Sequence, residues 1–208
     1  MEWVKKIIYR KAILMLFETR LWSWLLLDII PYIRFTCYYT SFPGWKYMRG
    51  YRHLEAGNFI LTIDKWKLTG LLIPGWDHAG LCINKGHEFE IAEMTHTNFT
   101  KSTFFDLCKT STRVSIWECP GWDWDYIYQV IIPTCLSFEN TPFDVKLEKG
   151  IKALACSEMV FESDPERRMG ASDEDILGLG IPYVSPTGLS KAKNVRCKWD
   201  SNNEVQEG

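Results

Sequence analysis

The sequence contains no paired-cysteine motif. None of its seven cysteines forms a Cys-x-x-Cys pair, and none of their spacings matches a zinc site. The odd number and the wide spread argue against a disulfide framework and are typical of small apolar core residues. We therefore predict a reducing compartment and no zinc site.

The sequence also lacks a convincing membrane span and a signal peptide. The apolar stretch 12–33 is interrupted by Glu18, Arg20, Asp28 and Pro31, and it has no small-residue cleavage site. Strong charge of one sign is missing as well, because the formal net charge is −2. Nucleic acid is therefore not an expected partner.

The overall composition is that of a globular protein. Of the 208 residues, 46% are hydrophobic and 24% are charged, which suits one domain, alone or with an appendage. The 10 Trp, 9 Tyr and 11 Phe predict a large aromatic core, with some rings left to contact sugar, lipid or protein. Basic residues are concentrated in the first 52 positions, so this end could meet an anionic membrane surface or a partner.

Apolar periodicity predicts two helical segments within residues 3–35, and turn residues follow at 41–44. We interpret residues 1–50 as a helical N-terminal extension and residues 51–208 as the main domain. A free extension of this composition would expose several Trp and Leu side chains to water, which a soluble monomer tolerates poorly. We therefore predict a docking role for residues 1–50, with a protein partner preferred over a membrane surface.

The main domain is predicted to be α+β with an antiparallel sheet. Strands are expected at 58–63, 79–83, 88–93, 114–117 and 195–199, with a hairpin turn at Gly86 between the second and third. Helices are expected at 103–108, at 123–136 and from Cys156 to about Arg168. This order of helices, strands, helices and a last strand favours α+β over a βαβ alternation.

Three residues are candidates for a nucleophilic site. Cys156 lies at a predicted helix start, where free backbone N–H groups and the helix dipole favour an anion. His78 begins an apolar strand behind a Pro-Gly loop, a common place for a catalytic base. Glu93 lies across the predicted hairpin, where it could orient the imidazole.

Each candidate also has a plain structural interpretation: a buried inert cysteine, a hydrogen-bonded edge histidine and a solvent-facing glutamate. Asp77 could pair with His78, but adjacent strand residues point to opposite faces. His96 is the reserve candidate for a site residue, and Asp144 is interpreted as a loop anchor that hydrogen bonds nearby backbone.

The order of the motifs resembles the circularly permuted NlpC/P60, or papain-like, amidases of the YiiX type. The match covers roughly residues 55 to 200 and includes a Ser-Pro-Thr-Gly-Leu segment near the C-terminus. Its specific part is a Cys-Ser-Glu-Met helix start with a histidine upstream. The matching segments are Gly57–Leu61, Asp77–Leu81, Ile91–Glu93, Pro142–Asp144, Ala155–Val160 and Ser185–Leu189.

The resemblance implies a cysteine hydrolase that needs neither a metal nor an organic cofactor. In this interpretation Cys156 attacks a carbonyl, His78 transfers the proton and Glu93 holds the imidazole. The sequence departs from the family pattern at Asn58, Phe143 and Ala155, none of which is a catalytic group.

Three functions follow from these observations. The first is an amidase or endopeptidase that acts on cell-wall peptide, as the resemblance implies for a bacterial or phage-associated protein. The second is an acyl-lipid hydrolase or acyltransferase, which the apolar and basic N-terminus favours. The third is a structural or docking component, for example of a phage particle, that keeps a relict site.

Overall fold

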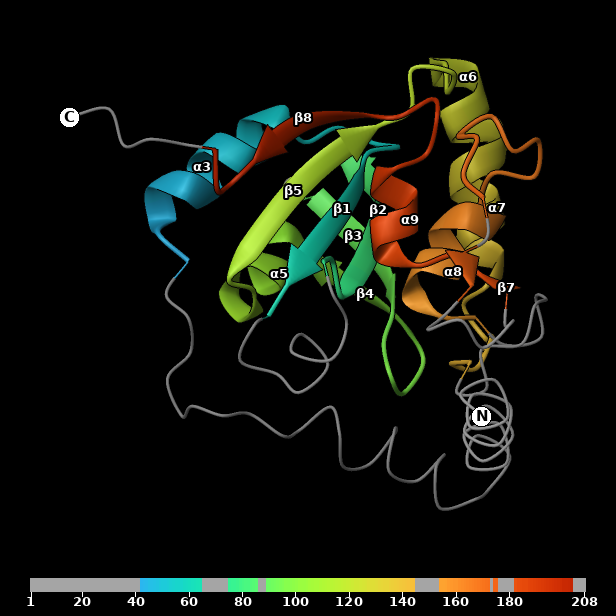
Figure 1. Ribbon diagram of the computed structural model, residues 1–208, viewed down its shortest axis with the longest axis horizontal. Coiled ribbons are helices and arrows are strands. Elements are labelled where there is room, and N and C mark those ends of the chain that lie inside the picture. Colours follow the sequence, from blue (N-terminus) through green and yellow to red (C-terminus); the bar gives the residue numbers. More distant parts are fainter. Residues whose placement is uncertain are drawn as a thin grey trace, which may run out of the picture.

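The computed structural model describes residues 42–64, 75–85, 89–144, 154–172, 174–175 and 182–203. This part of the chain is α+β and contains a six-stranded antiparallel sheet with the order β4-β3-β2-β1-β5-β8 (Figure 1). Its strands are β1 (Phe59–Ile63), β2 (His78–Lys85), β3 (Phe89–Met94), β4 (Phe99–Thr103), β5 (Arg113–Glu118) and β8 (Arg196–Asp200). A separate two-stranded ribbon joins β6 (Glu174–Asp175) to β7 (Pro182–Tyr183).

Two hydrophobic clusters hold the sheet between its helices. The smaller cluster joins the sheet to α3 (Gly44–His53) and α5 (Phe104–Thr110), both on the left in Figure 1. The larger cluster joins it to the helices on the right, where α8 (Cys156–Glu162) packs on β2 and β3. Residues 42–50 form the end of the predicted N-terminal extension, and they lie in α3 and in the two residues before it. Residues 1–41 are outside the described part.

The helix predicted over 123–136 is present as one continuous helical run with an irregular centre. It consists of α6 (Trp124–Tyr126), a π-helical turn over Ile127–Ile131, and α7 (Ile132–Ser137). The Asp123 side chain caps its start by accepting the Tyr126 N–H at 2.8 Å. Pro133 is near the start of α7, where its missing N–H costs little after the widened turn.

Most predicted elements are present, and the bounds of one helix differ clearly. All five predicted strands occur within the described residues, and the 103–108 helix is α5, capped by Thr103. The predicted turn at Gly86 lies outside the described residues. The helix that begins at Cys156 ends at Glu162 rather than near Arg168, because the chain turns there: Asp164 accepts the Met169 N–H at 2.7 Å and Arg167 has a φ of 57°.

Four elements were not predicted: α3, β4, the β6–β7 ribbon and α9 (Pro186–Ser190). In the described part of the chain, no helix has the length and apolar character needed to cross a membrane.

Candidate functional site

His78 is the first residue of β2, and contacts of the preceding loop fix its position. The Trp76 N–H donates to Thr187 Oγ1 of α9 at 3.0 Å, and the Arg113 guanidinium lies 4.4 Å from the Trp76 ring centroid. Gly75 has a φ of 92°, and a Cβ there would lie 2.4 Å from Thr187 Oγ1, so only glycine fits this close approach. The Ser-Pro-Thr-Gly-Leu segment therefore acts as a support for the His78 loop.

Strand register brings Glu93 to His78. Gly80 lies opposite Glu93 in the β2–β3 pair, so His78, two residues earlier on β2, is the diagonal neighbour of Glu93 on the same face. Glu93 Oε2 lies 2.6 Å from His78 Nε2, and the two side chains are 10% and 25% exposed. Because Nε2 is engaged by the carboxylate, Nδ1 is the ring nitrogen left for another partner.

A serine on the next strand extends this chain of contacts. Ser102 on β4 lies opposite Ile91, again diagonal to Glu93, and its hydroxyl donates to Glu93 Oε1. Both carboxylate oxygens of Glu93 are therefore hydrogen bonded, which fixes the plane of the carboxylate and its aim at His78. Three consecutive strands thus contribute one residue each to a His78–Glu93–Ser102 chain.

Cys156 is the first residue of α8 and is buried, with 7% of its surface exposed. The segment before it is held by a bridge between Phe143 and Leu154, in which the Asp144 N–H donates to the Leu154 carbonyl at 3.2 Å. The Glu158 carboxylate accepts the Ala155 N–H at 3.0 Å, which caps the helix immediately before the thiol. Contacts before and after Cys156 therefore stabilise the helix start that the sequence predicted.

The side chains of Cys156 and His78 are in contact, and this contact changes the pKa of His78. Burial is the largest single influence and lowers the pKa of His78, but the negative charge and the hydrogen bond of Cys156 oppose it. The hydrogen bond and charge of Glu93 act in the same direction, and the pKa of His78 rises from 6.5 to about 10. His78 is therefore protonated at neutral pH.

Tyr183 is a further polar group beside the thiol. Its hydroxyl accepts a hydrogen bond from Ser157 Oγ at 3.1 Å. Burial and the nearby charge of Cys156 raise the pKa of Tyr183. The phenol therefore keeps its proton and can donate it to a bound group.

Four described cysteines have a raised pKa and, unlike Cys156, no histidine partner among the described residues. Burial raises the pKa of Cys108, Cys119, Cys135 and Cys197, and for Cys135 the value is about 12. These thiols stay protonated and weakly nucleophilic at neutral pH. Among these thiols and Cys156, only Cys156 has a protonated imidazole beside it.

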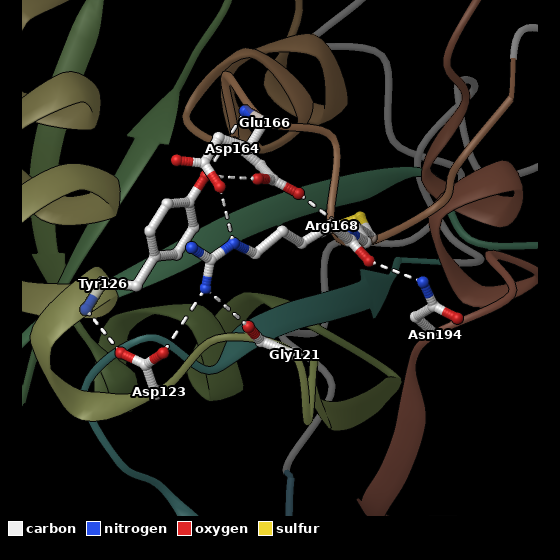
Figure 2. Close-up of polar contacts among 8 residues, drawn as sticks. Gly121, Asp123, Tyr126, Asp164, Glu166, Arg168 and Asn194 are labelled. Atoms are coloured by element: carbon white, nitrogen blue, oxygen red, sulfur yellow. Dashed lines mark hydrogen bonds and ion pairs between the residues drawn. The ribbon is translucent and has the colours of Figure 1, made fainter.

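A second polar network holds the loop that follows α8. Figure 2 shows Arg168 between two acidic side chains: its Nε donates to Glu166 at 2.9 Å, and an Nη lies 3.4 Å from Asp123. The guanidinium also lies 3.6 Å from the Tyr126 ring centroid, and the Tyr126 hydroxyl donates to the buried Asp164 at 2.8 Å. This network ties the loop after α8 to the start of α6 and supports α8 from its C-terminal end.

The structure brings together the three residues predicted from the sequence and leaves the reserve candidate elsewhere. His78, Glu93 and Cys156 form one chain of contacts, whereas His96 lies in the turn between β3 and β4. Sequence reasoning missed Ser102 and Tyr183. The Phe and Thr content of Phe99–Thr103, after a polar turn, was the signal for the strand that carries Ser102; the two-residue strand that carries Tyr183 has no such signal.

Comparison with known proteins identifies the fold. The sequence matches no family model and no curated protein sequence. The solved structure of the metalloprotein YiiX from Escherichia coli O157:H7 aligns with a TM-score of 0.59 at 15% identity, covering 71% of this chain and 97% of that chain. The chain therefore has a YiiX-like fold.

The word metalloprotein applies to that neighbour. Within the described residues of this chain, no group of three or more His, Cys, Asp or Glu side chains could hold a metal ion. His78, the site's histidine, is instead engaged by a carboxylate on Nε2 and by Cys156. The described residues of the site do not fit a metal centre.

Proposed function

We propose that this chain is a cysteine hydrolase that cleaves an amide bond through a thioester acyl-enzyme. The observation that carries the proposal is the Cys156–His78–Glu93 chain of contacts. It supplies a buried thiol, an imidazole in contact with it, and a carboxylate that fixes the ring. The base precedes the nucleophile in the sequence, which is the order expected of a circularly permuted papain-like enzyme.

In the first step the ionised sulfur of Cys156 attacks the carbonyl carbon, and a C–S bond forms. His78, protonated at neutral pH, then donates its proton to the leaving nitrogen as the C–N bond breaks. In the second step water attacks the thioester, His78 accepts a proton from the water, and the C–S bond breaks to release the acid. The sulfur leaves without a proton and His78 keeps the proton taken from water, so the starting state is restored and the cycle consumes only substrate and water.

Two features assist this chemistry. Ser102 and Glu93 hold the imidazole in one orientation, which leaves Nδ1 as the ring nitrogen available to the thiol. The Tyr183 hydroxyl, whose pKa is raised, can donate a hydrogen bond to the oxyanion that forms on the attacked carbonyl.

Cell-wall peptide is the substrate class that we propose first, because the motif resemblance is to enzymes of bacterial wall chemistry. An acyl ester of a lipid is the second class, favoured by the apolar and basic sequence of residues 1–41. Both substrates would form the same thioester on Cys156, so the site residues have the same roles in either case.

The test combines turnover with covalent labelling of the full chain. The wild type and Cys156→Ala are incubated with muropeptides and with acyl esters, and a thiol-reactive acyl probe is located by peptide mass spectrometry. Cys197→Ala, which removes an exposed cysteine outside the site, is the matched control.

We expect the probe on Cys156 and turnover of one substrate class in both the wild type and the control, with both signals lost in Cys156→Ala. Labelling that is no faster at Cys156 than at Cys197, together with no turnover, would refute the hydrolase and favour a structural role.

A further inference from the structure

The inner side of α3 is fixed against the sheet by aromatic packing. The Tyr47 ring stacks on Phe104 with centroids 5.6 Å apart, and the Tyr51 ring lies 4.9 Å from that of Phe89. A Cβ on Gly50 would lie 2.9 Å from Trp199, so the helix backbone itself touches the core. This packing determines which residues of α3 face away from the domain.

The outward side of α3 and the start of α5 expose large apolar side chains. Met48 is 52% exposed and Phe105 is 56% exposed, and they are two of the four exposed large hydrophobic residues in the described part of the chain. The Phe105 ring lies 5.7 Å from that of Tyr47, so the two helices meet at this point. We call the surface formed by these two helices the α3–α5 face; it consists of Trp45, Met48, Arg49, Arg52 and Phe105.

Two cations lie beside the Trp45 ring of this face. Lys46 Nζ and the Arg49 guanidinium lie 5.5 and 5.6 Å from the Trp45 ring centroid, and Arg52 is exposed one turn further along. Residues 42–54 contain no Asp or Glu.

The carboxylates nearest in sequence are those of Glu55, which accepts from Lys198 at 2.6 Å, and of Asp106, which accepts the Thr103 N–H at 3.2 Å in the cap of α5. The α3 helix therefore has basic residues and no acidic residue in the same segment as the exposed Met48.

We propose that the α3–α5 face binds an anionic lipid surface. A helix that lies flat at a membrane interface has an aromatic or apolar side directed at the acyl boundary, with Lys and Arg at the level of the headgroups. Here Met48 and Phe105 supply the apolar contacts, and Arg49 and Arg52 supply the charge. The sequence immediately before α3, residues 1–41, has the same basic and apolar composition, so attraction to an anionic surface continues along the chain.

The proposal is independent of the hydrolase activity, because no residue of the α3–α5 face belongs to the Cys156 site. Its test is co-sedimentation of the full chain with vesicles of phosphatidylcholine alone and of phosphatidylcholine mixed with phosphatidylserine. The variants are Arg49→Gln/Arg52→Gln and Met48→Ser/Phe105→Ser.

The matched control is Trp124→Ser/Tyr128→Ser. It removes the other exposed aromatic pair, which is 70% and 39% exposed and begins the α6 helical run. A cooperative urea unfolding transition in every variant shows that each chain is folded.

We expect the wild type and the control to bind only the vesicles that contain phosphatidylserine, with binding that weakens as salt rises. The double Arg variant should lose about 30-fold in partition coefficient, and the Met48/Phe105 variant at least about 10-fold.

Three results would overturn the proposal: no binding of the wild type, equal binding to neutral vesicles, or variants that bind as the wild type does. The first would leave a protein as the occupant of this face, and the last would assign lipid binding to residues outside it.

Discussion

Replacing Glu93 with glutamine tests whether the carboxylate tunes the imidazole. The substitution keeps the shape of the side chain and an oxygen for Ser102, but it removes the negative charge that lies 2.6 Å from His78 Nε2. A hydrogen bond to a charged group contributes about 1.5–3 kcal/mol, and one pH unit in a pKa corresponds to about 1.4 kcal/mol. The pKa of His78 should therefore fall by about one to two pH units from its raised value.

The measurement is an NMR titration of the His78 ring, run beside the rate of iodoacetamide alkylation at Cys156. Glu90→Gln is the matched control, because Glu90 lies on the same strand but is exposed. We expect the titration midpoint of His78 and the pH profile of alkylation to move together in Glu93→Gln and to stay in place in Glu90→Gln. An unchanged His78 midpoint in Glu93→Gln, or an equal shift in the control, would refute the role given to Glu93.

Three further predictions concern the supports of the site. The pKa of His78 is raised from 6.5 to about 10 on folding, so its contribution to the free energy of unfolding is complete below about pH 6.5 and is lost as pH rises through about 10. Urea unfolding at a series of pH values should show this loss in the wild type and not in His78→Gln. Ser102→Ala should lower the free energy of unfolding by about 1.5–3 kcal/mol, since the buried carboxylate of Glu93 loses a donor, and an unchanged urea midpoint would show that the bond contributes nothing. Thr187→Val leaves the Trp76 N–H without its acceptor, so we expect a cost of about 1–3 kcal/mol and slower alkylation of Cys156, measured by the same two assays; loss of stability alone would make the contact structural only.

The pairing of His78 with Glu93 could be predicted because it follows from short-range rules. Alternating charged and apolar residues identified the third strand, and a single hairpin between it and the second strand fixed which residues approach each other. The helix start at Cys156 was visible for a similar reason, since helix caps depend on a few adjacent residues. Contacts between Cys156 and His78 join distant segments, and only the motif resemblance suggested them.

The helix α3 could not be predicted because its sequence contains strong helix breakers. Pro43 and Gly44 suggest a turn, and Gly50 lowers helix propensity in the middle of the segment. In the structure the Pro43 carbonyl accepts the Lys46 and Tyr47 N–H groups at 2.9 and 3.1 Å, and Gly50 is required by the close approach to Trp199. Tertiary packing therefore outweighs a local preference that points the other way.

The strand order has a consequence for when the site becomes reactive. His78, Glu93 and Ser102 lie on three consecutive antiparallel strands, with sequence separations of 15 and 9 residues between contacting partners. Contacts of such short range form early in folding, whereas docking of α8 against β2 must close a much longer loop. We therefore expect the imidazole and its carboxylate to be assembled before the thiol reaches them, so that the reactivity of Cys156 at neutral pH reports when α8 docks on the sheet.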